Sequence, residues 1–151
     1  MESVQFRFWS HNNVPPQWYF KFHLDMDENI SQAKVVVLNT FRGLAADGTQ
    51  QVNFYPSYVC TADELALMLE DALPFVRALR KRGEISEKAY EIIEDLDGLT
   101  SSLSGEQNAK FWTNDALLHD PVWDTIRQKS SAVLVELGDA DSEEGYDPNV
   151  S

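Results

Sequence analysis

Apolar and polar residues alternate in the first part of the chain with the two-residue period of a β-strand. Apolar side chains occupy every second position in residues 4–8 and again in residues 18–24. Successive side chains of a strand point to opposite faces, so each run would direct one apolar face inward. The residues between the two runs, 11–17, include two prolines, which cannot donate to a β-ladder. The pattern predicts two strands joined by a loop.

Two more strands are predicted before residue 60. Residues 33–41 contain four consecutive apolar residues, which is typical of a central strand covered on both faces. Glycine and aspartate in residues 42–50 indicate a turn, and residues 52–55 then begin a fourth strand. Because the connections are short, we expect a mainly antiparallel four-stranded sheet over residues 1–60.

At Thr61 the apolar period changes to that of a helix. Thr61 and Glu64 have the spacing of a capping box, in which each side chain bonds the backbone N–H of the other residue. Apolar residues then recur at helical spacing as far as Leu79. Pro74 is predicted to kink or split this helix, and Gly83 to end it.

Two further helices are predicted, and a fourth is ambiguous. One begins at Ser86 and ends at Gly98, and another begins at Asp120, where proline follows an N-cap acid. Residues 106–119 are ambiguous, and residues 132–137 are β-prone enough to form a fifth strand, although the start at Asp120 favours a helix. We therefore expect an α+β domain over 1–138, with a sheet in 1–60 and three to four helices packed on one face in 61–138.

The charge of the chain is concentrated in its second part. The formal net charge is −13: residues 1–60 carry −1, residues 61–138 carry −7 and residues 139–151 carry −5. Such a surface repels nucleic-acid backbones and anionic membranes and attracts basic proteins. General solubility is an equally good explanation of the charge.

Length and cysteine content indicate one cytoplasmic domain. A chain of 151 residues suits a single domain, and its only cysteine, Cys60, excludes an internal disulfide. The N-terminus lacks the features of a signal peptide, and no apolar run approaches the ~20 residues of a membrane span.

A series of acids marks the second predicted helix. Glu84, Glu87, Glu91 and Glu94 are spaced by three, four and three residues, which would place them on one helix face beside Asp95. Like charges at these spacings weaken a helix slightly, which is consistent with use as a docking edge for a basic partner. A solvated outer face is the alternative interpretation.

The last thirteen residues form an acidic tail without a core pattern. We expect residues 139–151 to be disordered, either as a solubility tail or as an arm that binds a basic groove with tyrosine as its anchor. The residues of that arm are Asp139, Asp141, Glu143, Glu144 and Tyr146.

No catalytic or metal motif is complete. Residues 25–36 start like a calcium loop, but Ile30 replaces the required glycine and Val36 the bidentate glutamate. The pair His119-Asp120 lacks the further ligands of a metal phosphohydrolase, and Cys60 lacks the context of a nucleophile. We therefore expect no cofactor and no metal.

The leading hypothesis is a non-enzymatic acidic inhibitor that occludes a basic partner such as a toxin, a nuclease or a nucleic-acid-binding protein. It would resemble an immunity protein or a phage anti-defence protein that mimics nucleic acid, and would bind neither nucleic acid nor membranes itself. One alternative is a small-molecule-binding protein or enzyme with a pocket between sheet and helices, using His23, Asp25 or His119. Another is an adaptor or oligomerisation module.

Overall fold

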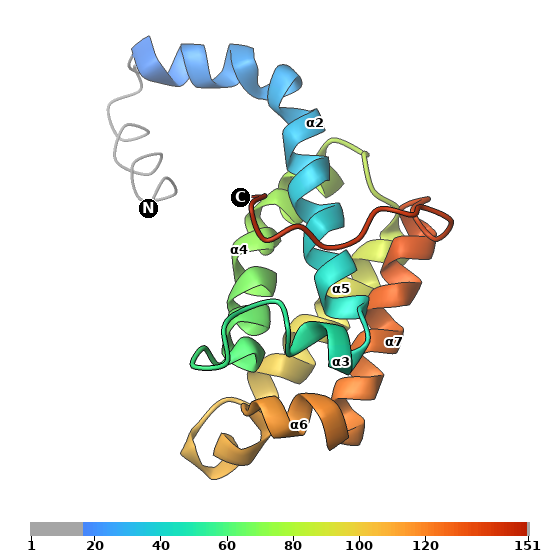
Figure 1. Ribbon diagram of the computed structural model, residues 1–151. Coiled ribbons are helices and arrows are strands. Elements are labelled where there is room, and N and C mark those ends of the chain that lie inside the picture. The colour runs from blue at the N-terminus through green and yellow to red at the C-terminus, as the bar shows by residue number, and fades with distance from the viewer. Residues whose placement is uncertain (1–16, 151) are drawn as a thin grey trace. The chain divides into compact units, whose positions relative to one another are not determined.

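The computed structural model describes the backbone of residues 17–150 and the side chains of residues 29–150 (Figure 1). The chain divides into two compact units, residues 1–32 and residues 33–151. The described part of the first unit is the beginning of helix α2 (Gln17–Ala45). The second unit contains the remainder of α2 and all the other described elements.

The second unit is helical. Its elements after α2 are α3 (Gly48–Gln51), α4 (Thr61–Lys81), α5 (Glu87–Ser102), the 3₁₀ helix η1 (Glu106–Phe111), α6 (Asn114–His119) and α7 (Pro121–Glu136). A tail follows α7 from Gly138 to the end of the described chain. No helix in the described residues is long and apolar enough to cross a membrane.

The predicted α+β fold is wrong, because no strand occurs among residues 17–150. The second and third predicted strands, residues 18–24 and 33–41, both lie in α2, and the fourth, residues 52–55, consists of turns and bends after α3. The first predicted strand, residues 4–8, lies outside the described residues. In the described part of residues 1–60, helices and turns therefore stand where the sheet was predicted.

The burial of α2 explains why the third predicted strand is a helix. Ala33, Val37, Phe41 and Leu44 are 7%, 1%, 0% and 1% exposed, and they recur at the three- and four-residue spacing of one helix face. Val35 is 44% exposed, although a doubly covered strand would bury it. A short apolar run fits both periods, and here the helical stripe continues beyond the run to Leu44.

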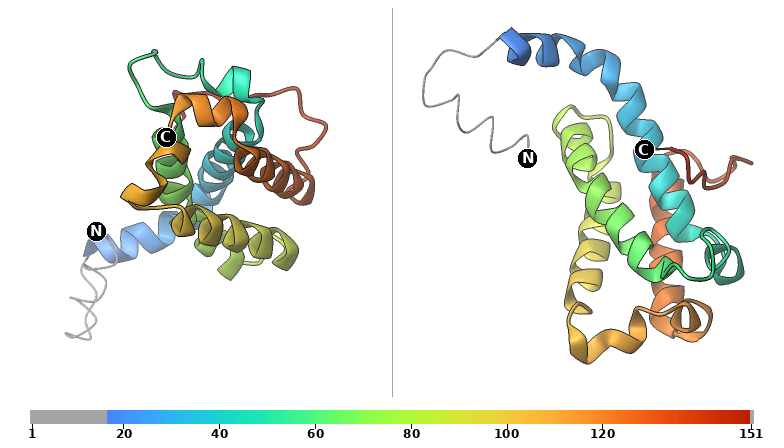
Figure 2. Two further views of the ribbon diagram at one scale, coloured as in Figure 1. Left: turned by 90° about the horizontal axis from the view of Figure 1, so that it is seen from below. Right: turned by 60° about the vertical axis from the view of Figure 1, so that its left-hand side comes forward.

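Helices α4, α5 and α7 pack with the second half of α2 around a common apolar core (Figure 2). Helix α5 contacts both α4 and α7. The core is made of aliphatic side chains such as Leu65, Leu69, Ile93 and Ile126, each at most 1% exposed. Burial of this size stabilises a fold by ~1.5–3 kcal/mol per side chain.

An aromatic cluster closes the core beside η1. Phe111 stacks on Trp123 with ring centroids 5.0 Å apart, and Trp112 meets both rings edge-on. Both indole N–H groups donate hydrogen bonds to backbone carbonyls: Trp123 to Phe111 at 3.1 Å, and Trp112 to Leu103 at 2.8 Å. The cluster joins η1 to the start of α7.

The predicted starts of α5 and α7 are confirmed. The Ser86 hydroxyl accepts the N–H of Ala89 at 3.0 Å, and the Asp120 carboxylate accepts the N–H of Val122 at 2.9 Å, with proline at the first turn of α7. Helix α7 continues to Glu136, so the β-prone residues 132–137 do not form a strand.

Two predictions at helix ends are wrong. Thr61 is the first residue of α4 and makes no capping box; its N–H instead donates to the side chain of Asn114 on α6 at 3.0 Å. Gly98 does not end α5, which continues to Ser102. Pro74 lies inside α4 without dividing it into two helices.

Candidate functional site

The acids predicted to share a helix face do so on α5, with one exception. Glu87, Glu91, Glu94 and Asp95 are all exposed on this helix. Their opposite face is anchored by Ala89, Ile93 and Leu96, each 0% exposed. Glu84 precedes the helix, so it is not part of the same face.

Two of the predicted acids already have basic partners in the chain. Glu84 forms an ion pair of 2.7 Å with Lys34 of α2, and Glu87 accepts two hydrogen bonds of 3.0 Å from the guanidinium of Arg80. The Arg80 hydrogen bonds lower the pKa of Glu87 from its usual value. Both pairs are exposed, so water and salt screen them.

Three acids of α5 have no basic partner among the described residues. Glu91, Glu94 and Asp95 are exposed, and neither a hydrogen bond nor an ion pair compensates them in the described chain. The nearest base in sequence, Lys88, is turned toward Glu136 of α7, 3.9 Å away. We call these three residues the open acidic face. They are held on a well-packed helix and present uncompensated negative charge.

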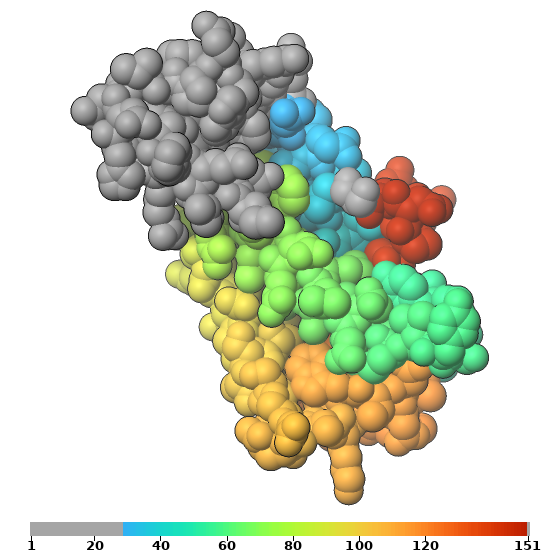
Figure 3. Space-filling view, turned by 90° about the vertical axis from the view of Figure 1, so that its left-hand side faces the viewer, coloured from blue at the N-terminus to red at the C-terminus, as the bar shows by residue number. Residues whose placement is uncertain are grey.

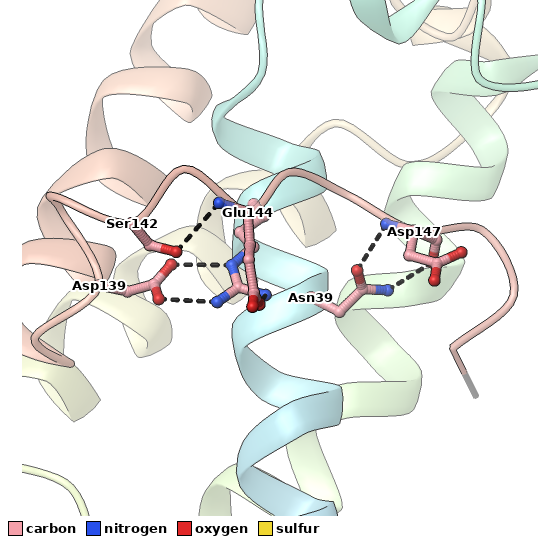
Figure 4. Close-up of polar contacts among 6 residues, drawn as sticks. Asn39, Asp139, Ser142, Glu144 and Asp147 are labelled. Atoms are coloured by element: carbon pink, nitrogen blue, oxygen red, sulfur yellow. Dashed lines mark hydrogen bonds and ion pairs between the residues drawn. The ribbon is translucent and has the colours of Figure 1, made fainter.

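The acidic tail, in contrast, lies against α2, and the prediction that it is disordered is wrong (Figure 4). Asp139 accepts two hydrogen bonds from the guanidinium of Arg42, at 2.8 and 2.7 Å, and both side chains are largely buried. Glu144 adds a contact of 3.2 Å to the same guanidinium. These carboxylates raise the pKa of Arg42, and the geometry is the strong bidentate form of an ion pair.

The side chain of Asn39 binds the backbone of the tail. Its side-chain N–H donates to the carbonyl of Asp147, and its side-chain oxygen accepts the N–H of the same residue, both at 2.8 Å (Figure 4). Asn39 is 5% exposed. A single buried amide therefore satisfies both main-chain groups of one tail residue.

Tyr146 anchors the tail between α2 and the segment after α3. Its ring lies 4.4 Å from the ring of Phe54, and its hydroxyl is 2.9 Å from that of Tyr55. A Cβ atom on Gly43 would lie 3.0 Å from the Tyr146 ring, so glycine provides the space for this ring. Burial, as the largest cause, raises the pKa of Tyr146 far above its usual value.

Only some of the predicted tail residues are engaged. Asp139, Glu144 and Tyr146 contact the helical unit, whereas Asp141 and Glu143 are exposed. In the view of Figure 3, α4 lies between the visible part of α5 and the tail.

Residues that hold the tail were not identified from the sequence. We define the tail site by five of them: Asn39, Arg42, Gly43, Phe54 and Tyr55. One local signal existed, since Arg42 is among only four bases in residues 1–60. Its partners are 97 residues or more away along the chain, and composition does not reveal such a pairing.

A cavity of about 830 Å³ opens between the tail, α3 and α7. Arg42, Asp139 and Tyr146 lie at its edge, and Ala46, Leu134 and other small or apolar residues line it. Among the described residues that line the cavity, Arg42 is the only base, and it is already paired with the tail. The cavity is the space that the tail spans between its two anchors.

The residues considered for chemistry lie only partly within the described side chains. His119 is exposed at the end of α6, 3.9 Å from Asp115. The side chains of His23, Asp25 and Asp27 lie outside the described residues. Cys60 donates its thiol to the carbonyl of Trp112 at 3.0 Å, and burial raises its pKa. Within residues 29–150, no group of three or more His, Cys, Asp or Glu side chains could hold a metal ion.

Comparison with protein-family models, with curated proteins and with solved structures finds no match to this chain.

Proposed function

We propose that this chain is a non-enzymatic acidic protein that binds and occludes a basic surface of a partner protein. The partner class is a toxin, a nuclease or another nucleic-acid-binding protein, as for an immunity protein or an anti-defence mimic of nucleic acid. The open acidic face supports this proposal best: Glu91, Glu94 and Asp95 are exposed, adjacent and uncompensated on an anchored helix. Such an arrangement attracts cationic partners over long range.

The neighbouring ion pairs extend the same surface. Glu87 lies one turn before Glu91, and its partner Arg80 is itself exposed. A basic partner can compete for Glu87 because an exposed pair is weakly held. The second proposed contact is the tail, whose exposed acids Asp141 and Glu143 add further negative charge.

A charge-reversal experiment tests the proposal. The purified full-length chain serves as bait for the proteome of the organism that encodes it, beside the triple variant Glu91→Lys, Glu94→Lys, Asp95→Lys. We expect proteins captured by the wild type to be strongly basic and to be lost with the variant. Their binding should weaken as salt rises, and added nucleic acid should compete with the bait.

The matched control reverses three other exposed acids, one on each of α4, η1 and α6: Glu70→Lys, Glu106→Lys and Asp115→Lys. This variant has the same net charge as the first one but keeps the open acidic face. It should retain the captured proteins. Equal loss with both variants, or captured partners that are neutral and insensitive to salt, would contradict the proposal.

A further inference from the structure

The tail is attached to the helical unit in the manner of a ligand. No residue after Val133 belongs to the buried apolar core of the described chain. The backbone of residues 140–150 contains neither helix nor strand, and most of its side chains are exposed. The core is therefore complete without the tail, which is held by a few specific contacts at its surface.

Each residue of the tail site recognises a different feature of the segment. Arg42 pairs with two carboxylates, at positions 139 and 144, in charge-assisted contacts. Asn39 recognises the main-chain N–H and carbonyl of the residue at position 147, whatever its side chain. Gly43, Phe54 and Tyr55 form a seat for an aromatic ring with a hydroxyl at position 146.

We propose that the tail site is a recognition site for an acidic, tyrosine-containing peptide, and that residues 139–147 of the same chain are its displaceable resident ligand. The preferred pattern is Asp, then Glu five residues later, then Tyr two residues after that Glu, with any residue at the position that follows the Tyr. The inference does not depend on the open acidic face.

The connection between α7 and the segment is short. Gly138, between the helix and the first anchor Asp139, has φ +77°, a conformation that glycine adopts without strain. A docked segment joined by so short a link competes with any free peptide at an effective concentration in the range of ~mM. Free peptide should therefore bind well only when the resident segment is weakened.

The test uses full-length protein and a fluorescent synthetic peptide that corresponds to residues 139–150. In the tail-weakened variant, Asp139→Asn and Tyr146→Ser remove two anchors and leave the tail site unchanged. We expect fluorescence anisotropy to show binding at least about ten-fold tighter to this variant than to the wild type, because the competing resident segment is lost. A control peptide with the same two substitutions should bind about ten-fold more weakly than the native peptide.

A third substitution tests the location of the site. Gly43→Ala, added to the tail-weakened variant, places a Cβ 3.0 Å from the position of the Tyr146 ring. Its other close neighbour, at 3.1 Å, is the terminal methyl group of Met68, the far end of a flexible side chain that can shift. Alanine favours a helix more than glycine does, so α2 is not weakened. We expect peptide affinity to fall by about ten-fold while circular dichroism and the melting temperature are maintained. Asn39→Ala should lower the affinity as well.

Several results would overturn the inference. One is a folded tail-weakened variant that does not bind the peptide; another is equal binding to the wild type and to the variant. Binding that persists after both Gly43→Ala and Asn39→Ala would show that the peptide binds elsewhere. None of these results concerns a basic partner, so failure here is distinct from failure of the proposed function.

Discussion

The open acidic face of α5 and the acidic tail have similar compositions but different environments. Glu91, Glu94 and Asp95 are solvated and uncompensated, whereas Asp139 and Glu144 both contact the guanidinium of Arg42 of the same molecule. Both regions contain adjacent acids, and sequence alone predicts the same role for them. The difference shows that a cluster of acids indicates an external partner only when the fold supplies no internal base.

Because of their different burial, we expect the two acidic regions to contribute differently to the free energy of unfolding. The side chains of Arg42 and Asp139 are 13% and 11% exposed, and they are joined by two short hydrogen bonds. The three acids of the open face have no such contacts, and their mutual repulsion is screened by water and salt. Substitution should therefore affect the stability of the tail region and leave the stability of the α5 face nearly unchanged.

The largest expected effect comes from removing the base under the tail. Arg42→Met leaves Asp139 without its partner, and we expect a loss of about 1–3 kcal/mol in the free energy of unfolding. Denaturant unfolding measures this loss, and hydrogen exchange should show faster exchange at the N–H of Asp147. The control Arg80→Met removes an exposed pair and should have a smaller effect. Equal losses would contradict the contrast between buried and exposed acids.

An intermediate effect is expected from alkaline pH on the tail. The pKa of Tyr146 is raised in the folded protein, so the docked tail binds its phenol proton more tightly than the released tail does. Docking is therefore fully favoured below the ordinary tyrosine pKa of 10.0 and weakens as pH rises above it. Hydrogen exchange or the fluorescence of a label on the tail would follow this release.

Tyr146→Phe is the matched control for this pH dependence. Phenylalanine keeps the ring on Phe54 but does not titrate, so the alkaline release attributable to Tyr146 should disappear. An identical alkaline release in both proteins would show that another group controls the docking.

The smallest effect is expected from neutralising the open face. Glu91 and Glu94 are three residues apart on one helix face, where like charges repel. The free energy of unfolding of the double variant Glu91→Gln, Glu94→Gln should lie within about 0.5 kcal/mol of the wild-type value and be slightly higher. Thermal and denaturant unfolding measure this change. A clear loss of stability would mean that these carboxylates have a structural partner.

Local signals predicted the second part of the fold. Ser86 caps α5 and Asp120 caps α7. Each cap joins residues only two or three positions apart, so the local sequence was sufficient to predict it. The position at which α4 starts was predicted, but its capping box was not found, because the N–H of Thr61 is bound by Asn114 of another helix. The period of residues 33–41 was misinterpreted because a short apolar run satisfies both a strand and a helix.

The sequence by itself determined which segments form the later helices and where the negative charge lies along the chain. Both depend on residues that are near one another in sequence. Only the tertiary structure decided that α2 is a helix and that the tail is docked. The helical stripe of α2 is fixed by burial against other helices, and Arg42 meets Asp139 across 97 positions. Charge pairing over such a separation depends on the fold, so composition indicated an acidic surface without showing which acids remain free.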